Sequence, residues 1–500
     1  MKEISSKFLG ENGIHRVPLW RIALFALNNT STNLYLFLMN YVAYYLGGWV
    51  GVGTVMAGSF SMMMRIWDGV TDPFVGFMVD KTNGKFGKNR PFMVIGNIIL
   101  CVTSFILFHV THLLPMAARF PFFIVVSAIY YLGYTCQCVV TKSAQTCLTN
   151  DPKQRPLFSI FDGIYNTALF TGLFIVAAQL GTKYGGFTTN VAIFHDLWLM
   201  FALMSAVFCA LAVIAIAPKD RIEFFGTGEV QKVGLKDYWD TLKGNRAIQM
   251  LVVSASTDKL ANSMKGNAVM MIVLCGIVIG DFKLSGTLSG LISIPTMLLM
   301  LLGIGALATK LGQRKAMLIG SWGGIITNAL LILLWLVGDY KSMSAGDGAI
   351  NWGFFAIAYI LLNILLGGFT GISGNIVIPM TADCADYEVY RTGRYVPGLM
   401  GTLFSFVDKL VSSFAPMLVS IGFAAIGFKD VLPDLTHAEA VNADPAWFQA
   451  TFIMTLALLY GSVIIGNLCN VIALKFYPLT KEKMEEIQGE IARIKAERSK

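Results

Sequence analysis

Residues 197–217 read LWLMFALMSAVFCALAVIAIA and contain no charged side chain. As an α-helix, a stretch of about 20 such residues rises roughly 30 Å, which is the thickness of the hydrocarbon layer of a bilayer. Comparable runs recur from one end of the 500-residue chain to the other. The sequence therefore predicts a protein that crosses a membrane many times.

The composition agrees with this prediction. Hydrophobic residues make up 55% of the chain and charged residues only 14%, whereas soluble domains carry about 25% charged residues. The eight cysteines are scattered, and no cluster of Cys and His has the spacing of metal ligands. These features argue against a secreted disulfide scaffold, a nucleic-acid-binding module and a cytosolic enzyme.

Twelve apolar runs are long enough to be helical spans, so we expect an all-α integral membrane protein. Their ranges are 19–47, 52–79, 92–112, 122–147, 160–183, 196–217, 247–279, 284–308, 315–338, 352–381, 397–428 and 448–476. The side of the membrane that holds both termini carries 28 Lys and Arg residues, and the opposite side carries five. Because cytoplasmic loops are enriched in these residues, we expect both termini in the cytoplasm and the chain in a cell (inner) membrane.

The connection 218–246 divides six spans from six. We expect an N-terminal six-helix bundle in 1–217, a C-terminal six-helix bundle in 247–476, and a cytoplasmic amphipathic tail in 477–500. The loops 80–91 and 309–315 each place a glycine turn and a basic cluster at corresponding points of the two halves. Two six-span halves with matching loops are typical of the major facilitator fold.

Charged side chains inside spans are costly and therefore indicate function. The second span carries Arg65, Asp68 and Asp72 on one helical face, with Thr71 beside them and Pro73 next in the chain. Two carboxylates one turn apart repel each other, and a bound cation, a shared proton or Arg65 would relieve the repulsion. A static bridge between Arg65 and Asp68 is the alternative, but it leaves the second acid unexplained.

Four other spans carry polar residues on a helical face. On the fourth span, Thr135 could offer a hydroxyl oxygen to a cation, and Lys142 could meet an anionic ligand or an acid on another helix. Further polar residues are Tyr134 and Cys138 on this span, Asn29, Asn33 and Asn40 on the first, and Asp258, Lys259, Asn262 and Lys265 on the seventh. The seventh span is polar enough to be discontinuous, unless it simply begins later in the chain. On the eleventh span, Lys409 shares a face with Ser405, Ser412 and Ser413 and is expected to face a cavity.

Two longer motifs resemble those of the glycoside–pentoside–hexuronide:cation symporter family. The first is MRIWDGVTDP at 64–73, continued by the loop 80–91, and the second is DCADYEVYRTG at 383–393, which runs on to Lys409. The motifs lie in both halves, so the resemblance covers the whole chain. It implies secondary active transport of a glycoside or related sugar, coupled to Na⁺ or H⁺, with no cofactor.

The resemblance also implies roles for single residues. Asp68, Asp72, Thr71 and Thr135 correspond to the coupling-cation site, with Asp68, Asp72 and Thr135 as metal-ion ligands, and Lys409 corresponds to a lysine beside that site. We assign Arg65, with Lys409, to coupling. Asn33 corresponds to a sugar-binding acid of the family's galactoside carriers.

Where those carriers have a second sugar-binding acid and a sugar-stacking tryptophan, this chain has Cys138 and Lys142. Asp162 lies in the region of their sugar-contacting arginine. The span-four surface is more positive than in a galactoside carrier, so we expect an anionic solute such as a hexuronide or a sulfonated sugar. Tyr134, Asp162, Lys259, Asn262 and Lys265 complete the expected solute site.

Two alternatives remain open: a cation-coupled carrier of lipid or lysolipid with the same fold, and a non-transporting membrane sensor. An enzyme is not expected, because none of the five histidines belongs to a catalytic constellation and no phosphate-binding glycine loop is present. The expected partners are a sugar-like solute, the coupling cation and the lipid bilayer, with no nucleic acid and with a monomer as the working unit.

Overall fold

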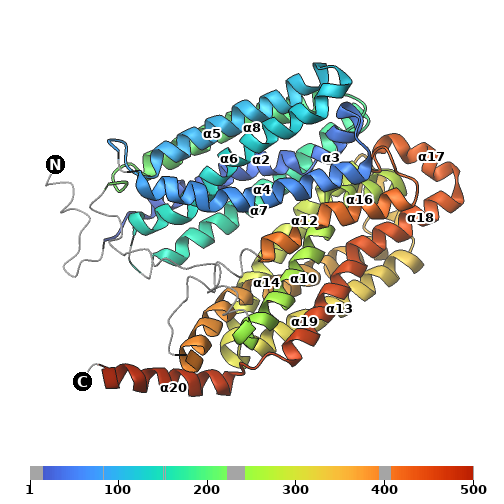
Figure 1. Cartoon of the computed structure of the whole chain (residues 1–500). Coiled ribbons are helices and arrows are strands. Elements are labelled where there is room, and N and C mark those ends of the chain that lie inside the picture. The colour runs from blue at the N-terminus through green and yellow to red at the C-terminus, as the bar shows by residue number, and fades with distance from the viewer. Residues whose placement is uncertain are drawn as a thin grey trace. The chain divides into compact units, whose positions relative to one another are not determined.

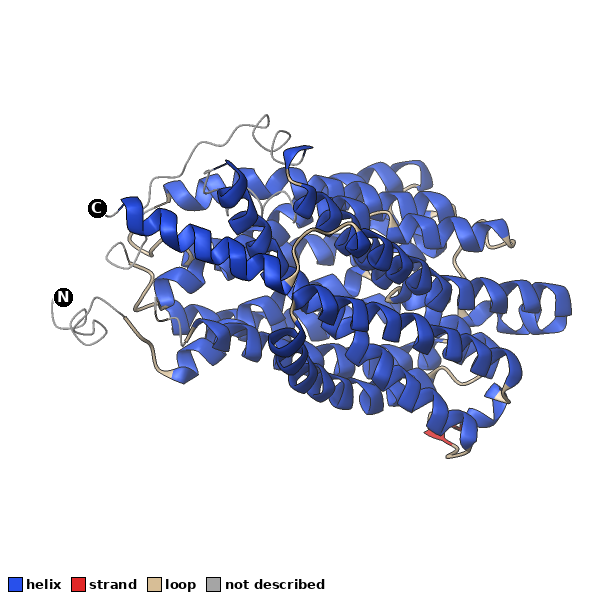
Figure 2. Ribbon diagram, turned by 90° about the horizontal axis from the view of Figure 1, so that it is seen from below, coloured by secondary structure: helices blue, strands red, loops and turns tan. Residues whose placement is uncertain are grey.

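The computed structural model describes residues 15–82, 84–149, 151, 154–221, 243–392 and 407–498. These residues are almost entirely helical, and the one pair of strands is a short hairpin, β1 (Ser344–Gly346) with β2 (Ala349–Ile350) (Figure 2). Most of the predicted connection 218–246 and the first ten residues of the predicted span 397–428, with Ser405, lie outside the described residues.

The chain divides into two compact units. Unit 1 comprises Met1–Glu229 and Lys429–Thr436, and unit 2 comprises Val230–Phe428 and His437–Lys500. The α-helices of unit 1 are labelled in Figure 1. The bounds of all its helices are α2 (Leu19–Met39), α3 (Val42–Tyr45), η1 (Leu46–Val50), α4 (Thr54–Lys81), α5 (Arg90–Phe105), η2 (Ile106–Val110), η3 (Thr111–Leu113), α6 (Met116–Leu148), α7 (Arg155–Tyr184) and α8 (Ala192–Ile216).

Unit 2 holds the remaining helices. Their bounds are α10 (Arg246–Lys265), α11 (Ala268–Met271), η5 (Ile272–Ile279), α12 (Lys283–Leu311), α13 (Gln313–Val337), η6 (Tyr340–Met343), α14 (Phe354–Thr392), α16 (Ala415–Ala425), α17 (Ala438–Ala443), α18 (Pro445–Leu456), η8 (Ala457–Gly461), α19 (Ser462–Lys475) and α20 (Lys481–Arg498). A helical stretch at 407–412 precedes α16, and η7 (Leu435–His437) lies where the chain passes from unit 1 back to unit 2.

A long helix lies in each of the twelve predicted spans, but they differ in polarity. Among the described residues, nine helices are long and apolar enough to cross a membrane, or ten if the bent pair α10 and α11–η5 is one span. The two others are α2 and α4. They carry the asparagines of the first span and the Arg65–Asp72 group of the second. These polar residues lower the mean hydropathy of the two helices.

The seventh span is broken, as its polar sequence predicts. Its two parts, Arg246–Lys265 and Ala268–Ile279, meet at an angle of 45°. The break lies at Gly266 and Asn267, and the Asn267 side chain accepts a hydrogen bond from the backbone N–H of Val269. The asparagine thus caps the second part, because it replaces a bond that the interrupted helix no longer makes.

The same helix pairings occur within each unit. In unit 1, α2 packs on α8, α5 on α6 and α4 on α6. In unit 2, the corresponding pairs are α10 with α19, α13 with α14 and α12 with α14. In both units the first span packs on the sixth, the third on the fourth and the second on the fourth. This correspondence is expected of two copies of one six-helix arrangement.

The segment Lys429–Thr436 contacts unit 1 although both of its neighbours in the chain belong to unit 2. The buried Asp434 carboxylate accepts hydrogen bonds from the backbone N–H of Thr188 (2.9 Å) and from its hydroxyl (2.7 Å). Tyr44 donates its hydroxyl proton to the carbonyl of Pro433 (2.8 Å). These bonds hold the segment against the ends of α3 and α7.

The basic loop between α4 and α5 is organised by one buried carboxylate. Asp220 follows α8 and accepts hydrogen bonds from the backbone N–H groups of Lys88 (3.1 Å), Asn89 (3.0 Å) and Arg90 (2.9 Å). It thereby satisfies amide groups at the N-terminus of α5, where no helical acceptor exists. Gly87 has φ +85°, and a Cβ there would lie 2.3 Å from the Asp220 carboxylate. The loop motif therefore depends on both a glycine and this aspartate.

Asp220→Ala should lower the free energy of unfolding of unit 1 by about 1.5–3 kcal/mol, because it leaves buried N–H groups without an acceptor. Thermal unfolding of the purified chain in detergent measures the change. Asp196→Ala is the control, since the Asp196 side chain is 46% exposed and pairs at the surface with Lys183 and with the Tyr184 hydroxyl (2.7 Å). Equal melting temperatures for the two variants would contradict the role given to Asp220.

Candidate functional site

A cluster of oxygen atoms lies between α4 and α6. Thr135 donates a hydrogen bond to the Asp68 carboxylate (3.0 Å), and Thr71 donates one to the backbone carbonyl of Asp68 (3.0 Å). The hydroxyl oxygens of Thr71 and Thr135 are also 3.0 Å apart. All three residues are buried, with exposed fractions of 2% for Asp68, 4% for Thr71 and 0% for Thr135. Three of the four predicted cation ligands therefore lie together.

The cluster contains more oxygen contacts than protons. Each threonine hydroxyl has one proton, so Thr71 and Thr135 can make two of the three contacts into hydrogen bonds at a time. The remaining contact brings two oxygen lone pairs together. Pro73 lies inside α4 and has no N–H group, so the carbonyl four residues before it, at Gly69, lacks its helical donor. Oxygen atoms that lack a hydrogen-bond donor can instead act as ligands of a cation.

Asp72 and Arg65 complete the charged face of α4. Asp72 is half-buried, one turn after Asp68, while Arg65 is exposed. The Arg65 guanidinium lies within electrostatic reach of Asp68, Tyr131 and Tyr134. None of the described ion pairs joins Arg65 to Asp68, so the static bridge considered from the sequence does not form here.

Two side-chain pairs connect α2 to α7. Asn29 donates a hydrogen bond to Asp162 (2.7 Å), and one turn further on Asn33 donates one to Asn166 (2.7 Å). Asn33 and Asp162, both predicted to bind solute, therefore belong to one polar ladder. Asn166 is not among the residues predicted to bind solute, although it follows Asp162 by four residues and so lies on the same face of α7.

The ladder and the oxygen cluster lie at similar heights along α6. Asn28, next to Asn29, donates hydrogen bonds to Thr141 (2.8 Å) and to the carbonyl of Gln137 (3.4 Å). Gln137 follows Thr135 by two residues, which is about 3 Å along the helix axis. Unit 1 therefore places its oxygen cluster and its amide ladder at nearly the same depth.

The three other predicted residues of α6 follow at intervals of four. Tyr134 and Cys138 are half-buried, and Lys142 is exposed. Lys142 forms no hydrogen bond or ion pair with any residue that the structure describes. Its ammonium group is therefore available to a ligand.

Unit 2 contains a separate cavity of about 320 Å³. Two predicted residues, Lys259 and Asn262, line it, whereas Lys265 is not among the lining residues. The complete lining is Ala255, Asp258, Lys259, Asn262, Thr370, Gly374, Val377 and Asp408. The carboxylates of Asp258 and Asp408 beside Lys259 were not included in the predicted solute site.

Lys409 is half-buried in the helical stretch 407–412 of unit 2. The cation ligands belong to unit 1, so the coupling role of Lys409 stays a prediction.

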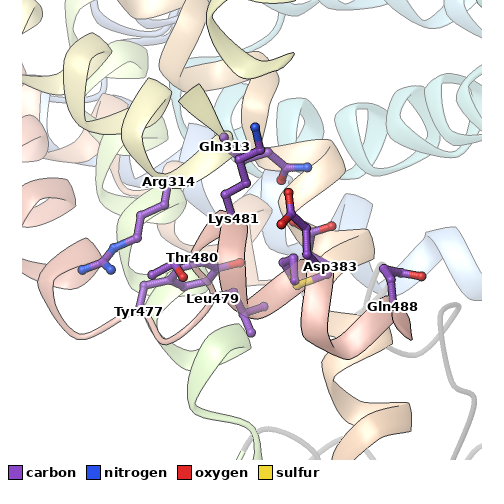
Figure 3. Close-up of a pocket in the computed structure, with 11 residues that line it drawn as sticks. Gln313, Arg314, Asp383, Tyr477, Leu479, Thr480, Lys481 and Gln488 are labelled. Carbon is purple, nitrogen blue, oxygen red and sulfur yellow. The ribbon is translucent and has the colours of Figure 1, made fainter. Parts of the chain in front are cut away.

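A larger cavity of about 500 Å³ lies between the start of α13, the last part of α14 and the start of α20 (Figure 3). Gln313 and Asp383 face each other there, whereas Arg314 points away and donates to the carbonyl of Leu474 (3.0 Å). Ile487 of α20 is buried in the adjoining hydrophobic core, so the predicted tail helix is packed on unit 2. None of the predicted site residues lines this cavity.

Comparisons with known proteins agree with this architecture. Residues 29–481 match the family described as MFS/sugar transport protein. The chain is 24% identical to the glucuronide carrier protein homolog of Escherichia coli (strain K12), over 88% of each chain. It is also 24% identical to the isoprimeverose transporter of Lactiplantibacillus pentosus, over 94% of this chain and 91% of that one, and 24% identical to the inner membrane symporter YicJ of Escherichia coli (strain K12), over 91% and 90%.

Solved structures share the fold at lower identity. The nucleoside transporter NupG superposes with a TM-score of 0.57 at 13% identity, covering 91% of this chain and 99% of that one. A proton-dependent oligopeptide transporter superposes with a TM-score of 0.58 at 13% identity, covering 94% and 99%. The chain has the major facilitator fold and is a membrane transporter rather than an enzyme, and it belongs to the MFS/sugar transport protein family.

Proposed function

We propose that this chain is a secondary active symporter that couples Na⁺, or H⁺, to uptake of an acidic glycoside by alternating access. The observation that carries the proposal is the buried oxygen cluster of Asp68, Thr71 and Thr135 between α4 and α6. A buried carboxylate with two threonine hydroxyls beside it is the kind of oxygen-rich donor set that binds a cation.

Sodium suits the donor set. Two carboxylates, a threonine hydroxyl and a carbonyl that lacks a helical donor could supply most of the oxygens that a sodium ion needs. Binding would neutralise the repulsion between Asp68 and Asp72 and so change which helix arrangement is favoured. We assign Lys409 and Arg65 to this coupling. Since cation and solute favour the same state, each must raise the affinity for the other by the same factor.

The solute site is proposed from Asn33, Tyr134, Cys138, Lys142 and Asp162 in unit 1. Lys142 distinguishes an acidic solute from a neutral one, because its exposed ammonium has no partner among the described residues. A relative named as a glucuronide carrier homolog supports this choice. The proposed setting is the inner membrane with both termini in the cytoplasm, and the monomer is the transporting unit.

Asp68→Cys and Asp72→Cys should each abolish cation-driven accumulation, because one remaining carboxylate is too weak a ligand set for the coupling ion. Counterflow in proteoliposomes across a panel of neutral and acidic glycosides, with and without sodium, measures this. Uphill transport at wild-type level in both variants would refute the cation site. A wild type that moves no glycoside under any ionic condition would refute the proposed function itself.

Thr135→Val should reduce cation stimulation by about 10-fold or more, because it removes the hydroxyl that bonds to Asp68 and keeps the shape of the side chain. Thr135→Ser is the matched control, since it keeps the hydroxyl, and it should retain most of the stimulation. The sodium concentration that gives half-maximal uptake is the quantity to compare. Identical values for the valine and serine variants would show that the hydroxyl does not bind the ion.

Lys142→Gln should weaken an acidic glycoside by roughly 10- to 100-fold, which corresponds to loss of a charge-assisted contact of about 1.5–3 kcal/mol. The same variant should barely affect the neutral analogue of that glycoside. Competition of p-nitrophenyl glucuronide and p-nitrophenyl glucoside for uptake measures both effects in one assay. Equal losses for the two compounds, or tighter binding of the glucoside by the wild type, would contradict recognition of an anion by Lys142.

A further inference from the structure

The cavity of unit 2 differs chemically from the oxygen cluster of unit 1. It is lined by two acids, one base, one amide and the hydroxyl-bearing Thr370, together with the small or apolar residues Ala255, Gly374 and Val377. A cavity with a few polar groups on an apolar wall is typical of sites for small organic ligands. The residues come from α10, α14 and the stretch 407–412, all within unit 2.

The two acids of the cavity differ in how far they are enclosed. Asp258 is 7% exposed, and the side chain of Asn262 donates a hydrogen bond to its backbone carbonyl (2.9 Å). Asp408 is half-buried, and its carboxylate has no hydrogen-bond partner among the described residues. Asp408 is therefore the acid that is more open to a ligand.

Lys259 is the electrostatic neighbour of both acids. Its charge acts on Asp258 and on Asp408, yet no described ion pair joins it to either carboxylate within the usual limit of about 4 Å. Lys259 is also exposed, so its ammonium opens onto the same cavity. The Lys259 ammonium, which can only donate hydrogen bonds, and the Asp408 carboxylate, which can only accept them, thus line the same cavity without forming an ion pair.

A hydroxyl group fits between such a pair because it accepts one hydrogen bond and donates another. A carboxylate on the ligand would face two like charges. A hydroxyl needs no counter-charge and can use the ammonium and the carboxylate together. The apolar wall offers contact to C–H groups. The chemistry therefore selects a neutral, hydroxylated fragment.

We propose that this cavity is a second subsite of the transporter, which binds an uncharged hydroxylated ring through Lys259 and Asp408 and excludes acidic groups. The inference rests on the proposed function, since it adds specificity-determining residues for the transported glycoside. It assigns recognition of a hydroxylated ring to the cavity of unit 2.

Gly374 allows a direct test of the cavity. Its exposed Cα lines the space, and an added Cβ would meet no atom within 4 Å. Gly374→Leu therefore fills the cavity without a clash at the backbone. Gly461→Leu is the matched control in the same unit, because the nearest atom to its Cβ is 3.9 Å away and it lines no described cavity.

The experiment measures KM for p-nitrophenyl glucoside and for its four monodeoxy analogues in proteoliposomes that hold the full chain. Asp408→Asn, Lys259→Gln and Gly374→Leu should each raise KM for the parent glucoside by about 10-fold or more. For one deoxy position, the wild type and Asp408→Asn should have the same KM, since the hydroxyl that contacts Asp408 is then absent from the ligand. Such a cycle separates a contact from a general structural defect.

Two results would overturn the proposal. One is a KM within about twofold of the wild type for all three variants. The other is a set of losses that is identical for every deoxy analogue, which would mean that the side chains act on the fold and not on a hydroxyl. Gly461→Leu and sodium stimulation of each variant show whether the protein is folded and coupled. A wild type without glycoside transport would instead refute the proposed function, and the subsite would be refuted with it.

Discussion

A carboxylate at the depth of the hydrocarbon layer must have its lone pairs satisfied by its own protein, because no water is available there to do so. Asp68 meets this requirement through α6, whose Thr135 donates to it, and the contact fixes how α4 and α6 lie against each other. Asn28 and Asn29 then position α2 against α6 and α7 by the same kind of bond. Polar side-chain contacts thus join α4 to α6, α2 to α6 and α2 to α7 within unit 1.

The two units share a plan but not a chemistry. The same ordinal helices pack together in each, yet unit 1 holds an oxygen cluster and an amide ladder, whereas unit 2 holds an ammonium and two carboxylates around a cavity. Helix packing is set by small residues and shape, so it tolerates different polar residues on the inward faces. A duplicated scaffold can therefore keep its helix pairings while the polar residues of its two halves differ.

Much of the fold could be predicted from sequence, because a bilayer forces runs of apolar residues and a bias of positive charge. Hydropathy alone understates α2 and α4, since they carry asparagines and charged residues, although their apolar runs were long enough to be predicted as spans. Resemblance to the symporter family indicated Asn33 and Asp162, and the polar sequence of the seventh span indicated Lys259, but neither identified the partners of these residues. Asn166, Asp220 and Asp408 were missed as functional partners because a contact between helices depends on their rotation and register, which a single sequence does not encode.

If the chain is the proposed symporter of a cation and an acidic glycoside, five charged residues of unit 1 would account for coupling without a direct contact between ion and solute. Asp68, Asp72 and Asp162 formally outnumber Arg65 and Lys142 by one, so an acidic solute that enters without the cation meets a net negative environment. One bound cation restores the balance, and its effect is large because charges interact strongly where water is excluded. The reverse also holds, since an acidic group near Lys142 raises the affinity for the cation at Asp68. A neutral glycoside would lack this mutual attraction, so the acidity of the solute and the tightness of coupling are consequences of one charge balance.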